Sequence, residues 1–149
     1  MAKGFSVCRF DQGMLAQLER AYRHLDAAEF WSWSAFRESL SKDSVDLFCA
    51  MQGQEVIGFL LSEMLIHDVE LYFIYVAKDF RSWGLGMALM KTWLEGLQAR
   101  MAEKVFLEVR ASNLSAQRLY ERCGFSRVSQ RKAYYKDGED AYIFQRVLR

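Results

Sequence analysis

Residues 69–90 decide the fold, and they read VELYFIYVAKDFRSWGLGMALM. The first part, residues 69–76, is rich in β-branched and aromatic side chains and predicts a strand. Two glycines, Gly84 and Gly86, then precede residues 87–101, whose apolar side chains recur at helical spacing. The stretch therefore predicts a strand that passes through a glycine-containing loop into a long amphipathic helix.

The glycine pair has two interpretations. Glycine has no Cβ, so main-chain N–H groups can approach a ligand closely, and the unpaired N–H groups of a helix N-terminus favour a phosphate. A plain tight turn would use the same residues. The segment is not a P-loop, because no Gly-Lys-Ser/Thr follows, and it lacks the full GxGxxG of a dinucleotide site.

The flanking sequence predicts the remaining elements by the same criteria. Before this stretch we expect a strand at 4–10, helices from Asp11 to about 25 and at 34–40, and strands at 45–51 and 55–66. After it we expect a strand at 104–110, a helix at 114–123 capped by Ser112 or Asn113 and ended by Gly124, and strands at 125–135 and 141–148 around the Asp137-Gly138 turn.

The resulting order, β-α-α-β-β-β-α-β-α-β-β, predicts a mixed α/β fold. A strand, helix and strand in succession predict that residues 69–76 and 104–110 form a parallel crossover pair. No repeat or linker-like stretch interrupts the chain, so residues 1–149 are expected to form one domain.

Composition excludes several function classes. A formal net charge of +1 argues against a nucleic-acid partner. Three cysteines without CxxC spacing, and two histidines (His24 and His67) without ligand spacing, predict neither a disulfide framework nor a metal site. The N-terminus lacks a secretory pattern and no apolar run is long enough for a bilayer, so we expect a soluble cytoplasmic protein.

A second informative segment, residues 107–125, reads LEVRASNLSAQRLYERCGF. It follows the R-x-x-G-x-G of residues 81–86, and the two in this order resemble the core of the GNAT acetyltransferases. The later RKAYYKDGEDAYIF at 131–144, together with Trp31-Ser32 and Phe36, is similar to the ribosomal-protein alanine acetyltransferases within that superfamily. The resemblance covers nearly the whole chain.

The resemblance implies an acetyl-CoA site and two catalytic groups. It places Glu108 as general base and Tyr120 as general acid. The residues that it assigns to acetyl-CoA are Ile74, Tyr75 and Val76 along the pantetheine arm, Ser82, Trp83, Gly84, Leu85, Gly86 and Met87 around the pyrophosphate, and Asn113 at the pantetheine portion.

The chemistry of acetyl transfer agrees with these roles. Attack on a thioester needs a neutral amine and a proton for the departing thiolate, and an α-amino group, whose pKa is about 7.7–8.0, loses its proton more easily than lysine. A main-chain N–H near Val76 would serve the developing oxyanion. Alternatively, Glu108 is a strand-end carboxylate paired with Arg110 or with solvent, and Tyr120 packs on the sheet with its hydroxyl exposed.

Aromatic residues also have two interpretations. Trp31, Trp33 and Phe36 either line an acceptor groove or belong to the core, and Tyr134 and Tyr135 either border a peptide channel or pack across strands. The chain departs from the family pattern at Phe73, Tyr75 and Trp83, which are bulkier than the usual residues. We expect Phe73 and Tyr75 to reshape the acceptor side of the site, whereas main-chain contacts to the phosphates depend little on side chains.

Three functions follow from the sequence. The first is acetylation of a protein N-terminus, the N-terminal alanine of a small-subunit ribosomal protein. The second is acetylation of another amine, such as a polyamine, an amino acid or a lysine side chain, and the third is a non-catalytic acetyl-CoA-binding module. Acidic residues near the acceptor would favour a polyamine, but they form a mixed set that does not decide: Glu29, Glu38, Asp43, Glu139 and Asp140.

Overall fold

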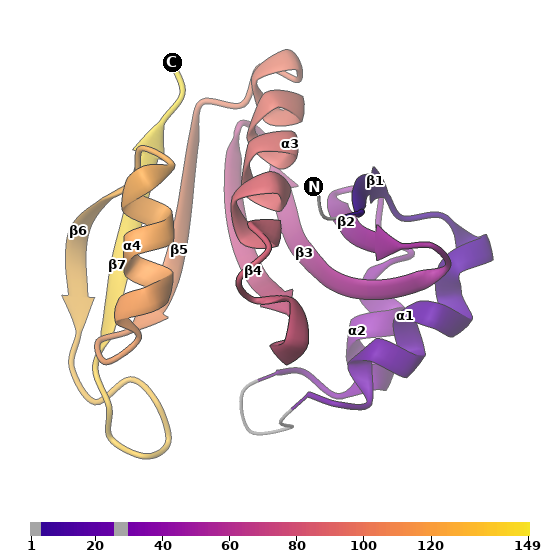
Figure 1. Cartoon of the computed structure of the whole chain (residues 1–149). Coiled ribbons are helices and arrows are strands. Elements are labelled where there is room, and N and C mark those ends of the chain that lie inside the picture. The colour runs from indigo at the N-terminus through magenta and orange to yellow at the C-terminus, as the bar shows by residue number, and fades with distance from the viewer. Residues whose placement is uncertain (1–3, 26–29) are drawn as a thin grey trace.

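A seven-stranded mixed sheet runs through the molecule (Figure 1) in the order β1-β2-β3-β4-β5-β7-β6. The computed structural model describes residues 4–25 and 30–149. Within them the strands are β1 (Ser6–Arg9), β2 (Val45–Gln52), β3 (Glu55–Leu65), β4 (Asp68–Val76), β5 (Lys104–Arg110), β6 (Ser126–Arg131) and β7 (Ala141–Val147). The helices are η1 (Gln12–Met14), α1 (Leu15–Tyr22), α2 (Trp33–Ser39), η2 (Lys78–Phe80), α3 (Leu85–Ala99) and α4 (Leu114–Arg122).

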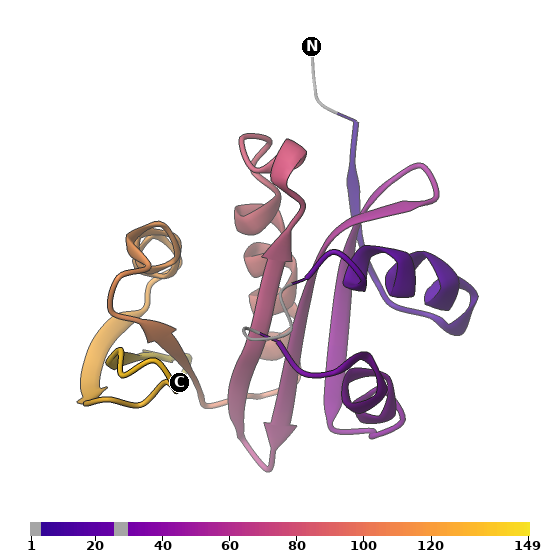
Figure 2. The same cartoon turned by 90° about the horizontal axis from the view of Figure 1, so that it is seen from below.

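Helices cover both faces of the sheet (Figure 2), and a separate hydrophobic core lies on each face. Helix α3 packs on one face of β2–β4 with α4 beside it over β5 and β7, and buried side chains such as Leu89 and Trp93 fill this core. Helices α1 and α2 pack on the opposite face, where Leu18 and Phe36 are fully buried. The candidate site lies at the place in the sheet where β4 and β5 separate.

Strands β4 and β5 are the parallel pair that the sequence predicts. Their pairing runs only from Asp68 opposite Lys104 to Leu71 opposite Leu107. The β3–β4 register shifts at the same point, because Leu61 faces Phe73 whereas Ser62 faces Leu71, which leaves Tyr72 as the extra residue of a bulge. A bulge bends its strand and increases the local twist. Beyond the bulge, β4 stays paired with β3 and β5 stays paired with β7. Strands β4 and β5 therefore diverge, and the sheet opens into a V (Figure 1).

The element order matches the sequence prediction, and the differences lie at element ends. The long helix α3 begins and ends two residues earlier than predicted, because Gly84 already adopts a left-handed φ of 81° and acts as the N-cap. The strand predicted at 125–135 stops at Arg131, since Ala133 has a positive φ of 51° that turns the chain. The predicted N-cap Asp11 caps the short η1, and α1 starts only at Leu15.

Candidate active site

The outer edge of β4 offers free main-chain groups to the opening. The Ala77 N–H donates to the Ile57 carbonyl oxygen, with an N···O distance of 2.8 Å. Main-chain groups of an antiparallel strand point alternately to either side. The N–H and C=O groups of Tyr75 therefore point toward β3, whereas those of Ile74 and Val76 point toward the gap that β5 leaves. There the Val76 carbonyl oxygen accepts a hydrogen bond from the Arg81 Nε at 3.3 Å.

The glycine loop presents the start of α3 at the same end of the gap. The first N–H groups of a helix have no partners within it, so Leu85, Gly86 and Met87 offer donors there. Both glycines also have structural reasons to be glycine. Gly84 needs its left-handed φ, and a Cβ on Gly86 would lie 3.2 Å from the Leu119 Cδ2 of α4. The two glycines therefore form the turn, and the first N–H groups of α3 follow directly after it.

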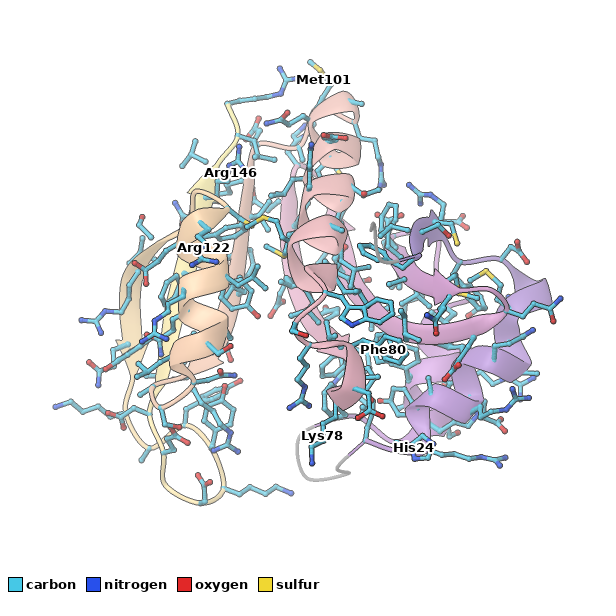
Figure 3. All side chains as sticks on the ribbon, viewed as in Figure 1. His24, Lys78, Phe80, Met101, Arg122 and Arg146 are labelled. Carbon is cyan, nitrogen blue, oxygen red and sulfur yellow. The ribbon has the colours of Figure 1, made fainter. Side chains whose placement is uncertain are left out.

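Side chains around the loop divide into buried and exposed ones. Trp83 is partly buried in the core, and its ring lies edge-on to Phe80 with centroids 4.8 Å apart. Ser82 is exposed. Lys78 extends from η2 below the first turn of α3 (Figure 3). The departure at Trp83 is thus accommodated by packing, and the main chain of the loop keeps its access to the opening.

A cleft of about 1170 Å³ occupies the opening between β4 and β5. It brings together the two predicted catalytic residues, Glu108 and Tyr120, with two of the predicted cofactor residues, Ile74 and Asn113. The remaining predicted cofactor residues, Tyr75, Val76 and the loop 82–87, lie outside its lining. The cleft also contains residues without a predicted catalytic or cofactor role, of which the most relevant are Trp31, Glu70, Tyr72, Tyr134 and Tyr135.

Glu108 lies on β5 with its side chain 22% exposed. Its carboxylate Oε1 is 3.7 Å from the Arg131 Nε of β6. The hydrogen bond between the Tyr134 hydroxyl and Glu108 is the main reason why the pKa of Tyr134 is raised. The alternative predicted from the sequence is an ion pair between Glu108 and Arg110. In the structure the Arg110 guanidinium instead forms ion pairs with Asp137 and Glu139, each at an N···O distance of 2.9 Å.

Tyr120 occupies the last turn of α4 and is only 6% exposed. Its ring packs against Phe125 and Phe144, each with centroids 6.2 Å apart. Burial is the main cause that raises its pKa above the ordinary value, with smaller effects from Tyr135 and Cys123. The hydroxyl therefore stays protonated at neutral pH, as a proton donor must. This packing agrees with the alternative in which Tyr120 packs on the sheet, and the residue also lines the cleft.

Asn113, rather than Ser112, is the N-cap of α4. Its Oδ1 accepts from the Ala116 N–H at 3.1 Å, and Asn113 also lines the cleft. The Ser112 N–H instead donates to Glu139 at 2.8 Å, so the start of α4 is tied to the loop between β6 and β7. That loop carries Tyr134 and Tyr135 to the cleft, with the two rings 5.2 Å apart.

The aromatic cluster divides between groove and core. Trp31 lines the cleft and packs on Tyr72 and Phe73, with centroids 5.0 and 4.9 Å apart. Phe36 is fully buried, and Trp33 packs beside it at 6.1 Å. The bulge of β4 explains this arrangement, because it places the consecutive side chains of Tyr72 and Phe73 on the same face.

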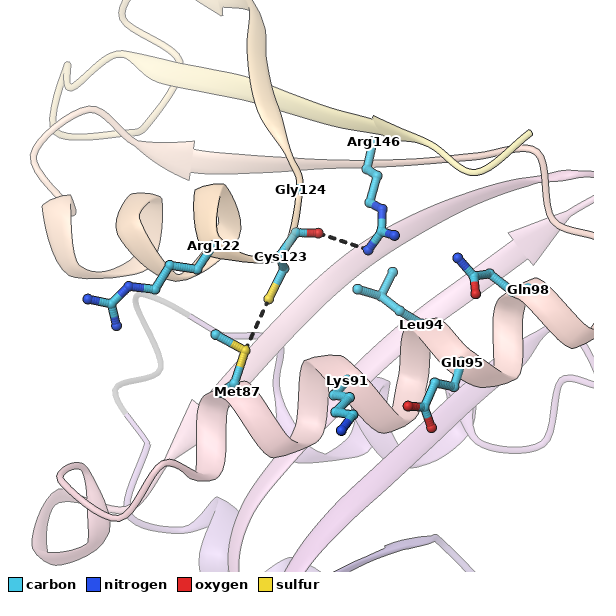
Figure 4. Close-up of a pocket in the computed structure, with 9 residues that line it drawn as sticks. All are labelled: Met87, Lys91, Leu94, Glu95, Gln98, Arg122, Cys123, Gly124 and Arg146. Carbon is cyan, nitrogen blue, oxygen red and sulfur yellow. Dashed lines mark hydrogen bonds between the residues drawn. The ribbon is translucent and has the colours of Figure 1, made fainter.

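A second, smaller cavity of about 410 Å³ lies between α3 and the end of α4 (Figure 4). The Arg146 guanidinium donates to the Cys123 carbonyl oxygen at 2.9 Å, and the Cys123 Sγ lies 3.7 Å from the Met87 Sδ. Met87 is the single predicted cofactor residue in its lining. The lining of this cavity shares no residue with the lining of the larger cleft.

Sequence reasoning missed Glu70, Tyr72 and Arg131 at this site. The available signal was an ionisable residue, Glu70, inside an otherwise apolar strand. Of the acidic residues weighed for a polyamine, Glu29 lies outside the described residues, and Glu139 is tied to Arg110 and Ser112.

Neither a metal site nor a membrane span is found in the described part of the chain. No group of three or more His, Cys, Asp or Glu side chains in residues 4–25 and 30–149 is arranged to hold a metal ion. His24 lies on the α1 side of the molecule, away from β5 and α4 (Figure 3). None of the helices formed by these residues is long and apolar enough to cross a membrane.

Comparison with known families identifies the fold. The model of the acetyltransferase (GNAT) family matches residues 12–125. The chain belongs to the GNAT family. GNAT acetyltransferases use acetyl-CoA, and the chain is an acetyl-CoA-dependent N-acetyltransferase by this membership and by the N-acetyltransferases among its relatives.

Two curated relatives and two solved structures show what this GNAT member resembles. It is 34% identical over 116 residues to the [ribosomal protein bS18]-alanine N-acetyltransferase of Escherichia coli, covering 76% of this chain and 78% of the relative. It is 29% identical over 137 residues to an N-alpha-acetyltransferase of Saccharolobus solfataricus, covering 83% and 82%.

The structures agree with the sequence comparisons. The crystal structure of the ribosomal-protein-S18-alanine N-acetyltransferase from Escherichia coli superposes with a TM-score of 0.86 at 29% identity, covering 97% of this chain and 94% of that one. Arabidopsis thaliana NAA60 in complex with acetyl-CoA superposes with a TM-score of 0.83 at 19% identity, covering 97% and 98%, which shows the shared fold.

Proposed function

We propose that this enzyme acetylates the N-terminal amine of a protein, and that its substrate is the N-terminal alanine of a small-subunit ribosomal protein. The observation that carries the proposal is the convergence of Glu108 and Tyr120 on one cleft at the split of the sheet. Relatives named for protein N-terminal acetylation support the choice of acceptor, and those named for the ribosomal protein support the finer assignment.

The residues at the opening fit acetyl-CoA. We propose that residues 74–76 lie along the pantetheine arm, with the outward main-chain groups of Ile74 and Val76 as partners, and that the Asn113 amide contacts the same portion. The N–H groups of residues 82–87 receive the pyrophosphate, because the start of α3 provides donors and the positive end of the helix dipole.

The catalytic groups complete the transfer. We propose that Glu108 takes a proton from the acceptor ammonium, directly or through water, so that the neutral amine forms a C–N bond with the thioester carbonyl carbon. The outward N–H near Val76 stabilises the oxyanion. Tyr120 then donates its proton to the sulfur as the C–S bond breaks, and the proton that the new amide nitrogen loses restores the Tyr120 hydroxyl through solvent. The place of Tyr120 in the lining of the same cleft as Glu108 supports this role.

The test is intact-mass analysis of acceptors incubated with purified enzyme and acetyl-CoA. The panel contains a peptide that begins with the ribosomal alanine, its pre-acetylated form, a lysine peptide and spermidine. One added acetyl group on the free alanine peptide alone is expected. Glu108→Gln and Tyr120→Phe should each lower kcat by about 10²-fold or more, with Tyr142→Phe as a control outside the cleft lining. Transfer to lysine or spermidine alone would refute the ribosomal assignment.

We further propose that the enzyme acts in the cytoplasm as a single domain over residues 1–149, without a metal, nucleic-acid or membrane partner. The three cysteines are free thiols in the structure, which suits a reducing compartment.

A further inference from the structure

Glu70 lies on the same face of the sheet as Glu108. It is opposite Phe106 in the β4–β5 pairing, and Glu108 follows Phe106 by two residues, so the three side chains project to one side. The neighbouring Leu71 and Leu107 point to the other side, into the α3 core. Both carboxylates line the large cleft: Glu70 lies in the paired part of β4, and Glu108 lies one residue beyond the last β4–β5 pair, Leu71 opposite Leu107.

The groups that face Glu70 come from four elements. Burial raises its pKa most, and Glu108 of β5 and Glu63 of β3 raise it further, whereas Arg131 of β6 lowers it. On its own strand, Tyr72 donates its hydroxyl to Glu63 at 2.8 Å rather than to Glu70. Glu63 also accepts from Ser44 at 2.6 Å, so its carboxylate is already satisfied.

Glu70 has no comparable partner. Within residues 4–25 and 30–149 it forms no hydrogen bond and no ion pair, although it is half-buried beside a second carboxylate. Removing a carboxylate from water without a partner is unfavourable. Glu70, Glu108 and Arg131 together carry a formal charge of −1, which suits the arrival of one more cation.

We propose that Glu70 is a second carboxylate of the acceptor site, and that the ammonium group of the acceptor binds between Glu70 and Glu108. This inference rests on the proposed function, because it specifies how that site recognises the amine. An α-amino group is mostly protonated at pH 7. Glu70 binds the ammonium, Glu108 then takes its proton, and the aromatic side chains of Trp31 and Tyr134 border the rest of the acceptor.

The experiment compares Glu70→Gln with the wild type by calorimetry. The titrants are the alanine-starting peptide and its pre-acetylated form, added to the enzyme saturated with CoA. The two peptides differ in one positive charge. Because a charge-assisted hydrogen bond is lost, the variant should bind the free-amine peptide about tenfold more weakly and the acetylated peptide with unchanged affinity. Glu70→Asp should recover part of the loss, and Glu55→Gln, an exposed carboxylate at the start of β3, should bind both peptides like the wild type.

Kinetics provide the second measurement. The acceptor KM of Glu70→Gln should rise about tenfold while the acetyl-CoA KM stays unchanged. Equal weakening of both peptides would show a structural effect and overturn the proposal, as would unchanged affinity for the free amine.

The outcomes distinguish a failure of the role proposed for Glu70 from a failure of the proposed function. If the wild type acetylates the alanine peptide and Glu70→Gln binds it normally, the role of Glu70 is refuted while the function stands. If the wild type acetylates spermidine instead, the ribosomal function is refuted, and the same comparison is made with spermidine and its acetylated form. An enzyme that neither binds nor acetylates any amine of the panel would overturn both.

Discussion

The hydrogen bond between Trp93 and Ser62 joins α3, which starts at the glycine loop, to the sheet. The Trp93 Nε1 donates to the Ser62 Oγ at 2.8 Å, and the two side chains are 1% and 0% exposed. Ser62 also faces Leu71 in β4, next to the bulge. This buried contact therefore holds the helix over the place where the sheet opens.

Replacing Ser62 with alanine should destabilise the protein by about 1–3 kcal/mol, because it leaves a buried indole N–H without an acceptor. The structure leaves no water access to compensate, since both side chains are fully covered. For a domain of this size, each kcal/mol lowers Tm by roughly 2–4 °C.

Urea unfolding followed by tryptophan fluorescence and circular dichroism measures the effect. Ser129→Ala, an exposed serine of β6, is the matched control and should stay within about 0.5 kcal/mol of the wild type. Trp93→Phe and the double variant complete a double-mutant cycle that isolates the coupling. If Ser62→Ala is as stable as the control, or if the cycle shows no coupling, the argument that this bond anchors α3 is wrong.

Three further predictions concern the loop, acid stability and the groove. Gly84→Val should weaken CoA binding measured by calorimetry and lower stability by about 1–2 kcal/mol, because the left-handed φ of 81° is strained for a residue with a Cβ. The hydrogen bonds from Ser44 and Tyr72 hold the pKa of Glu63 below its ordinary value. That stabilisation is present above the unfolded-state pKa and lost as pH falls through the lower folded-state pKa, so Glu63→Gln should reduce the acid dependence of stability in urea titrations between about pH 3 and 7. Trp31→Ala should raise the acceptor KM several-fold and leave the acetyl-CoA KM unchanged, and an equal rise in both would contradict its placement on the acceptor side.

Local chemistry made several parts of the site predictable from sequence. Asn113 before α4 and Gly124 after it have cap and left-handed roles that depend on residue type alone, and the structure confirms both. The periodicity of α3 and the parallel pairing of residues 69–76 with 104–110 were likewise predictable. The family motifs assigned catalytic roles to Glu108 and Tyr120, and the structure brings both residues into the lining of one cleft.

The sequence by itself thus determined the element order, the glycine end of α4 and the family, because each depends on residue types over short distances. Only the tertiary structure decided where the sheet opens, since the bulge at Tyr72 arises from the β3–β4 register over many residues. The same holds for Glu70 and Glu108, which lie 38 positions apart in the sequence and which the β4–β5 pairing, with Glu70 opposite Phe106, brings to one face of the sheet. Strand register depends on which side chains of two paired strands are buried on the same face, so the pattern of one strand alone does not fix it.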